Sequence, residues 1–129
     1  MEFKHKKDIK LFCSLHPILI MIYSDLFWYT KEKHNVDLVI TETVSSFLQD
    51  KILKRRSKSH RQCRAIDIRT KNLDVFVLED ILNYINTKEE YKKYHYLSSS
   101  GKKRLGYYHI GSAEHIHLSI HSQYALNSE

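Results

Sequence analysis

Residues 59–67 read Ser-His-Arg-Gln-Cys-Arg-Ala-Ile-Asp, and they run into a stretch with the character of a β-strand. There, Ile66 and Ile68 point to one face and Asp67 to the other, because successive strand side chains alternate. Carboxylates are poor strand formers, so a carboxylate in the middle of a strand calls for an explanation. We therefore interpret His60 and Asp67 as candidate functional residues on a turn and on the strand that follows it.

The C-terminal part of the chain supplies a second stretch of this kind, Glu-His-Ile-His at residues 114–117. It opens a predicted strand at 115–121 in which apolar and polar side chains alternate. The apolar face consists of Ile116, Leu118 and Ile120, and the other face of His115, His117, Ser119 and His121. Three histidines on one strand face are too many for an ordinary core. They indicate a cleft, a metal ion or water.

The remaining pattern predicts an α+β fold, a small antiparallel sheet flanked by two main helices. Apolar residues at helical spacing predict helices at 14–31, with Ser14 as N-cap, and at 75–94. Strands are expected at 36–41, 65–69, 106–110 and 115–121, and residues 42–56 as a loop leading into a helix. The last two strands form a hairpin through a turn at Gly111 and Ser112. The 129 residues predict a single domain with a charged N-terminal segment at 1–12.

Composition excludes several classes of protein. Two cysteines, Cys13 and Cys63, cannot make a disulfide framework, which favours a reducing compartment. The longest apolar run, Ile18 to Tyr23, is far below the roughly 20 residues that span a bilayer, and no secretory signal precedes it. We expect a cytoplasmic monomer without membrane insertion.

Positive charge is concentrated just before and within the first stretch. The net charge is +6. The clustered basic residues are Lys51, Lys54, Arg55, Arg56, Lys58, Arg61 and Arg64. Such a cluster is typical of a solvated basic surface or of a site for a polyanion or a carboxylate-bearing substrate.

The two stretches together contain the side chains of a catalytic zinc site. Such a site needs three protein ligands, an open position for water and a carboxylate that removes the proton of that water. His60 and Asp67 on one segment and His117 on the neighbouring strand predict the ligands. Glu114, three residues before His117, is the candidate general base.

Both stretches resemble a known family. Residues 60–67 are similar to the His-x-x-Gly-Arg-Ala-x-Asp signature of the zinc D-Ala-D-Ala carboxypeptidases and L-alanyl-D-glutamate endopeptidases, whose fold is shared by the Hedgehog signalling domain. Residues 114–117 resemble the second motif of that family. Leu15-His16-Pro17 and Val39-Ile40-Thr41-Glu42 are also similar to it, so the resemblance covers most of the chain in the right order. We interpret the chain as a small phage-type member.

This resemblance implies Zn²⁺ held by His60, Asp67 and His117, with Glu114 as general base and His115 near the attacking water. The implied substrate is the stem peptide of bacterial peptidoglycan, cut by an endolysin that reaches the cell wall after release from the host cytoplasm. One of four arginines is then expected to bind the substrate carboxylate, and the sequence does not decide which one. They are Arg55, Arg56, Arg61 and Arg64.

Two departures from the family pattern keep other functions open. Lys58 stands where the family commonly has Ser, and Cys63 replaces the usual Gly. Cys63 with His60, His115 and His117 would instead make a closed, structural zinc site in a binding module. A nucleic-acid-binding protein that uses residues 51–64 is the third hypothesis, although the chain has no recognisable nucleic-acid-binding motif, and we expect no stable nucleic-acid partner.

Overall fold

The structure, a computed structural model, describes residues 1–110 and 113–126. Its helices are α1 (Lys6–Phe12), α2 (Pro17–His34), α3 (Phe47–Ile52), α4 (Val75–Thr87) and the 3₁₀ helices η1 (Glu89–Tyr94) and η2 (Ser122–Tyr124). Its strands are β1 (Glu2–Phe3), β2 (Val39–Glu42), β3 (Ala65–Arg69), β4 (Tyr96–Leu97), β5 (Lys103–Arg104), β6 (Gly106–His109) and β7 (His115–Ser119). The α+β class predicted from the sequence is observed.

Within the described residues, five strands form the main sheet in the order β1-β2-β3-β7-β6. All neighbours are antiparallel except β1 and β2, which run parallel, so the sheet is mixed rather than purely antiparallel. β6 and β7 pair as the predicted hairpin, while the predicted turn at residues 111 and 112 lies outside the described residues. β3 has the predicted bounds and lies at the centre of the sheet.

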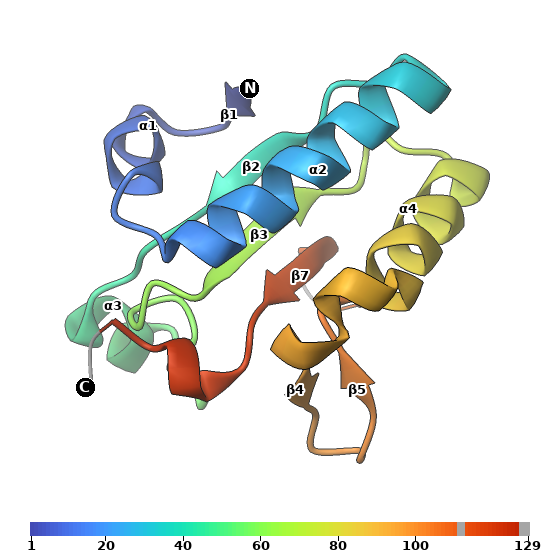
Figure 1. The fold of residues 1–129 in the computed structure, drawn as a ribbon. Coiled ribbons are helices and arrows are strands. Elements are labelled where there is room, and N and C mark those ends of the chain that lie inside the picture. Colours follow the sequence, from blue (N-terminus) through green and yellow to red (C-terminus); the bar gives the residue numbers. More distant parts are fainter. Residues whose placement is uncertain (111–112, 127–129) are drawn as a thin grey trace.

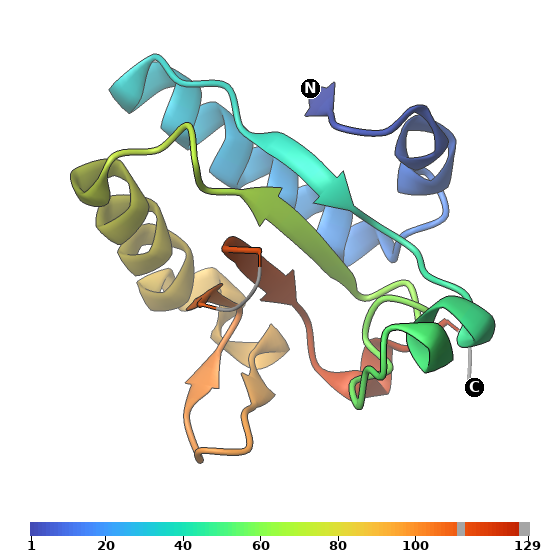
Figure 2. The same cartoon turned by 180° about the vertical axis from the view of Figure 1, so that it is seen from behind.

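Helix α2 lies across one face of β2 and β3, and α4 lies beside it near the β6–β7 hairpin (Figure 1). The buried residues between these layers include Leu19, Ile22, Ile66, Ile81 and Ile116, each at most 1% exposed. In the opposite view the strands lie in front of α2 and turn their second face to the viewer (Figure 2). Ile66 and Ile68 therefore pack toward the helices, and Asp67 projects from the other face.

Two predicted helix boundaries were wrong. Helix α2 starts at Pro17 rather than Ser14, because His16 caps it: the Ile18 N–H donates to His16 Nδ1 at 3.1 Å. The predicted helix 75–94 ends at Thr87, since Lys88 is extended and a 3₁₀ turn follows.

Two further predictions fail around residue 42. Glu42 closes strand β2 instead of opening a loop. In addition, α3 spans only six residues, so most of the basic cluster follows that helix rather than lying on it.

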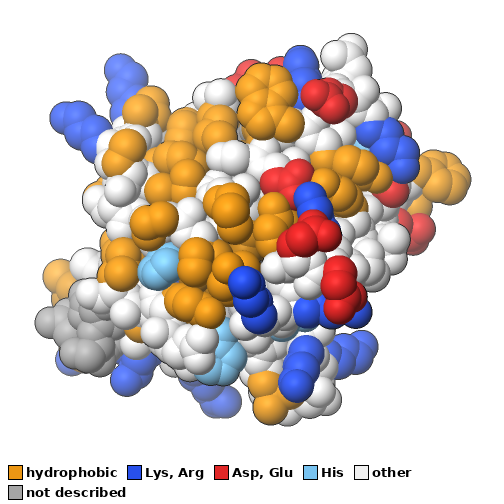
Figure 3. Space-filling view, viewed as in Figure 1, with side chains coloured by type: hydrophobic (Ala, Val, Ile, Leu, Met, Phe, Trp, Pro, Cys, Tyr) orange, Lys and Arg blue, Asp and Glu red, His pale blue; other side chains and the backbone are white. Residues whose placement is uncertain are grey.

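Apolar side chains are also present at the surface. They spread over the face on which α2 lies (Figure 3), where Met21 is 46% and Trp28 57% exposed. Among the described residues, no helix is long and apolar enough to cross a membrane.

Candidate metal centre

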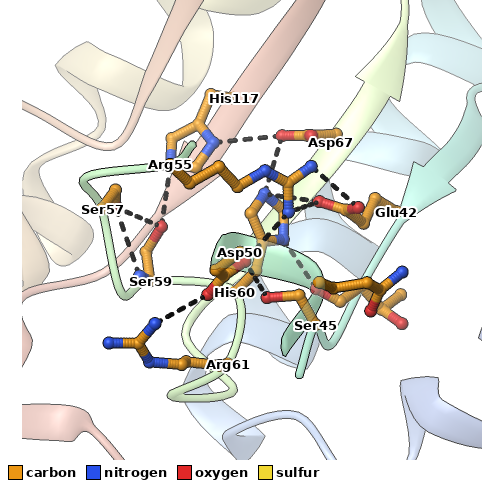
Figure 4. A network of polar contacts seen from close by, with 12 residues as sticks. Glu42, Ser45, Asp50, Arg55, Ser57, Ser59, His60, Arg61, Asp67 and His117 are labelled. Carbon is orange, nitrogen blue, oxygen red and sulfur yellow. Dashed lines mark hydrogen bonds and ion pairs between the residues drawn. The ribbon is translucent and has the colours of Figure 1, made fainter. Parts of the chain in front are cut away.

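Three side chains converge on the face of the sheet that α2 leaves uncovered. One ligand atom each of His60, Asp67 and His117 lies within 4.8 Å of the other two (Figure 4). Asp67 Oδ1 is 3.1 Å from His60 Nε2 and 3.0 Å from His117 Nδ1. This trio can hold a metal ion, and it is the ligand set that the sequence predicted.

The sheet register explains why residues 50 positions apart meet. Asp67 on β3 and His117 on β7 are directly opposite each other in the antiparallel ladder. Directly opposed side chains share a face of the sheet and have Cβ atoms about 5 Å apart. His60 arrives from the turn before β3, which is closed by bonds from Cys63 N–H to the His60 carbonyl and from Arg64 N–H to the Ser59 carbonyl.

Both imidazoles are oriented by an oxygen behind them. His60 Nδ1 donates to the Thr43 carbonyl at 2.6 Å, and His117 Nε2 lies 3.3 Å from the Ser59 hydroxyl. Thr43 is held in turn by the buried Asp8, whose Oδ1 accepts from its N–H at 3.1 Å and from its hydroxyl at 2.6 Å. Such contacts behind metal-ligating histidines fix the tautomer and the ring orientation.

The charge balance of the trio favours a cation. The Thr43 carbonyl can only accept, so His60 Nδ1 carries a proton, and a neutral His60 ring then turns a lone pair toward Asp67 Oδ1. Two facing lone pairs repel, and either a second proton on His60 or a metal ion removes the conflict. The donor set, two imidazoles and one carboxylate, suits Zn²⁺ and related divalent ions.

The pKa directions reflect this competition. Burial opposes the charged form of His60, but its hydrogen bond to Asp67 and the charges of Asp67 and Glu42 hold the pKa above the ordinary 6.5. Burial lowers the pKa of His117, and the neighbouring His60 and His115 act in the same direction. Burial also disfavours ionised Asp67, yet its bonds to both histidines keep the pKa of Asp67 far below its usual range.

A carboxylate that the sequence analysis did not assign to the site lies next to the trio. Glu42 Oε2 is 3.4 Å from His60 Nε2, and Arg55 holds the same carboxylate with Nη1 at 2.8 Å from Oε2 and Nη2 at 2.9 Å from Oε1. Glu42 is close because β2 pairs with β3 and brings Glu42 opposite Asp67. Because the strand was predicted to end at residue 41, Glu42 was not placed on the sheet beside Asp67.

The candidate catalytic residues lie on the β7 side. His115 Nε2 is 3.6 Å from Asp67 Oδ1, while its Nδ1 donates to the Ala113 carbonyl at 2.9 Å. Glu114 is exposed and accepts a hydrogen bond from the Tyr108 hydroxyl at 2.5 Å. It lines a hollow of about 500 Å³ whose wall also includes Asp67 and His115, so it neighbours the trio without touching it.

A larger cleft of about 560 Å³ opens over the trio. Its wall contains basic and aromatic side chains, among them Arg55, Arg56, Arg64, Arg104 and Tyr107. Arg104, which the sequence analysis did not single out, lies over the Tyr107 ring at 4.4 Å from its centroid. A negatively charged ligand fits the electrostatics of this wall.

The four arginines considered for substrate binding differ in their surroundings. Arg55 and Arg61 both pair with the buried Asp50, at 3.3 and 3.2 Å. Arg64 donates to Gln62 and to the Ile120 carbonyl, at 2.9 and 3.1 Å. Arg56 is exposed at the rim of the cleft, whereas Arg61 is not part of the cleft wall.

Comparisons with protein-family models, with curated proteins and with solved structures found no match. The functional argument therefore rests on the residues and on their geometry. Cys63, the fourth ligand of the closed-site hypothesis, is not a member of the His60–Asp67–His117 group. It is half-buried in the turn before β3, and burial raises the pKa of its thiol.

Proposed function

We propose that this protein is a metal-dependent peptidase of the zinc D-Ala-D-Ala carboxypeptidase and L-alanyl-D-glutamate endopeptidase type, acting on the peptidoglycan stem peptide as a phage endolysin. The observation that carries the proposal is the convergence of His60, Asp67 and His117 beneath an open cleft. A trio of protein ligands that opens to a cleft is the arrangement of catalytic rather than structural zinc sites.

The backbone at Cys63 also supports the resemblance. Its φ is 61°, in the left-handed region that glycine adopts without steric cost. The signature that the sequence resembles has glycine at this position, so a conformation suited to glycine occurs where the family pattern places one. The Ser59 hydroxyl, shifted by one position from the family serine, contacts His117.

The residues suit hydrolysis of a peptide bond in the following way. A divalent ion at the trio would supply Lewis acidity and an acidified water. Glu114 is the proposed proton acceptor, and the Tyr108 hydroxyl holds its carboxylate at the wall of the adjoining hollow. His115 donates its Nδ1–H to the Ala113 carbonyl, so its Nε2 lone pair faces the trio and can accept a proton on the substrate side.

Substrate recognition is assigned to the basic wall of the cleft. Stem peptides carry free carboxylates, and guanidinium groups bind carboxylates in bidentate geometry. Arg56 and Arg104 are the proposed contacts, since both line the cleft. Arg55 is held by Glu42 and Asp50 and is assigned to positioning Glu42 beside His60.

The test is digestion of purified peptidoglycan by zinc-loaded protein, with released fragments identified by mass. We expect Glu114→Gln to keep its metal and lose activity by ~10²-fold or more, the scale of a lost general base. Glu42→Gln is the matched control, and we expect weaker metal binding but a smaller loss of rate at saturating zinc.

Two results would contradict this proposal. If zinc-loaded wild type releases no fragment, the site is structural and the peptidase assignment fails. If Glu42→Gln at full metal occupancy loses more activity than Glu114→Gln, the general base is Glu42.

A further inference from the structure

Helix α3 has an inverted polarity for a surface helix. Its side chains that face solvent are Phe47, Leu48, Lys51 and Ile52, and the three apolar ones are 58, 65 and 69% exposed. Its inward side carries Asp50, which is 1% exposed and bonded to Ser45, Arg55 and Arg61. A surface helix ordinarily turns its apolar residues to the core and its polar ones to water.

The orientation of α3 is fixed by specific bonds. Ser46 and Gln49 form a reciprocal capping box at its N-terminus. Asp50 then ties the helix to the two arginines behind it. The helix cannot bury Leu48 and Ile52 by rolling without breaking this buried carboxylate network.

Exposed basic residues lie among and directly after these apolar residues in the sequence. Lys51 lies between Leu48 and Ile52 on the helix, and the chain continues through the exposed Leu53 into a basic loop. The exposed basic residues of the patch are Lys51, Lys54, Arg56 and Lys58. Within the described part of the chain, none of these four forms an ion pair, so their charge is available to a ligand. We call Phe47, Leu48, Ile52, Leu53 and these four residues the α3 patch.

We infer that the α3 patch adsorbs the protein onto an anionic phospholipid surface. Apolar side chains interspersed with lysines and arginines match a lipid interface, where acyl chains take up the apolar groups and headgroup phosphates bind the basic ones. A lysine at the centre of the patch can extend its ammonium to the headgroups while its methylenes stay among apolar groups. A protein partner would instead leave Lys51 at the dehydrated centre of an interface, where lysine is depleted. A nucleic acid would leave Leu48 and Ile52 without a suitable contact.

This inference places the cleft next to the membrane. Arg56 belongs both to the α3 patch and to the wall of the cleft over the trio. The α3 helix lies at the periphery of the fold beside the described C-terminal end, where no other helix covers it in either view (Figures 1 and 2). The expectation of no membrane insertion is unaffected, since the helix lies on the surface and is far too short to span.

The experiment is cosedimentation of the full chain with vesicles of phosphatidylglycerol or of phosphatidylcholine. We expect binding to phosphatidylglycerol that weakens by about tenfold or more as salt rises from about 0.1 M to about 1 M, since the screening length then falls to ~3 Å. Phosphatidylcholine vesicles are expected to retain far less protein.

Paired variants separate the two components of the patch. Leu48→Ser with Ile52→Ser, and separately Lys51→Gln with Lys54→Gln, are each expected to weaken binding by about tenfold or more. All four positions are exposed, so circular dichroism and zinc binding are expected to stay unchanged. Phe76→Ser is the matched control, because Phe76 is 79% exposed on α4, away from the α3 patch, and its loss is expected to leave binding intact.

A spectroscopic readout locates the contact. The chain has a single tryptophan, Trp28, so Leu48→Trp in a Trp28→Phe background reports from the patch alone. We expect its emission to shift to the blue on phosphatidylglycerol vesicles. Three outcomes would overturn the inference: equal binding to both lipids, binding that the serine variant leaves unchanged, or self-association in the absence of lipid that the serine variant abolishes.

Discussion

The candidate ligand His60 depends on Asp8, a residue that lies far from it in sequence and is not part of the trio. Asp8 on α1 is fully buried and holds both the N–H and the hydroxyl of Thr43, whose carbonyl accepts from His60 Nδ1. This chain of contacts links the position of α1 to the candidate ligand His60. Asp8 is therefore a positioning residue for the trio.

We predict that Asp8→Ala lowers the free energy of unfolding by about 1–3 kcal/mol, because it leaves two buried Thr43 donors without an acceptor. Zinc affinity is expected to fall by about tenfold or more, as for other groups behind metal ligands. Chemical denaturation and zinc titration measure the two effects. Asp37→Ala is the control, since it removes a half-exposed ion pair with Lys31. We expect it to lower the free energy of unfolding by less than about 1 kcal/mol and to leave zinc affinity unchanged. Unchanged zinc affinity in Asp8→Ala would contradict the positioning role.

The protonation of His60 predicts how zinc binding depends on pH. Its folded pKa is raised, so protonated His60 stabilises the metal-free protein below pH 6.5, and that contribution is lost as the pH rises through the folded pKa. Zinc needs the deprotonated Nε2, and the pKa of His117 is lowered, so His60 supplies the proton that is displaced.

We therefore predict that zinc affinity rises by about tenfold per pH unit from about pH 6 up to the raised pKa of His60, and levels off above it. Calorimetric titration at several pH values measures this slope. An affinity that does not change across this range would show that His60 is not a ligand.

At the scale of elements, the sequence predicted what alternation and apolar periodicity can encode. Strand β3 was placed at its observed bounds because Ile66 and Ile68 flank Asp67, and the pairing of β6 with β7 was predicted from the turn residues between the two strands. The parallel contact of β1 with β2 and the short β4–β5 hairpin were missed, since β1, β4 and β5 have only two residues each and show no period. Glu42 was missed at the site for a related reason, because its place depends on a β2 register that shifts at residues 40–42.

Asn86 connects α4 to the start of β6, a contact that no sequence pattern predicted. Its side chain on α4 accepts from the N–H groups of Leu105 and Gly106, at 2.8 and 3.0 Å, and donates to the Gly106 carbonyl at 2.8 Å. These bonds fix the start of β6, and β6 supports β7, which carries His117. β6 is an edge strand, and the Asn86 amide supplies the hydrogen bonds that a neighbouring strand would make on its open edge.

We predict that Asn86→Ala lowers the free energy of unfolding by about 1–3 kcal/mol, because it leaves partly buried backbone groups unpaired. Thermal unfolding measures the change. Asn83→Ala is the control on the same helix, since Asn83 is exposed and its side chain has no described bond. Equal effects of the two substitutions would contradict the anchoring role.

For the whole molecule, the sheet brings together two stretches of sequence, neither of which contains a complete site by itself. The first supplies His60 and Asp67, the second His117, and the β3–β7 register aligns them under the cleft. The convergence of these three candidate ligands was predictable from residue type and spacing. The neighbouring carboxylate, the Asp8–Thr43 support and the inverted α3 helix were not, because each depends on which surfaces the fold places side by side.

Titration of Zn²⁺ into chelator-stripped protein tests the central claim most directly. We predict one tight site per chain in wild type, and loss of that site in His60→Ala, Asp67→Ala and His117→Ala, with the folded state checked by circular dichroism. Cys63→Ser is expected to bind zinc as wild type does, and Co²⁺ in the same site to show no thiolate charge-transfer band. Stoichiometric binding that survives all three alanine variants, or a thiolate band that Cys63→Ser removes, would contradict the His60–Asp67–His117 centre.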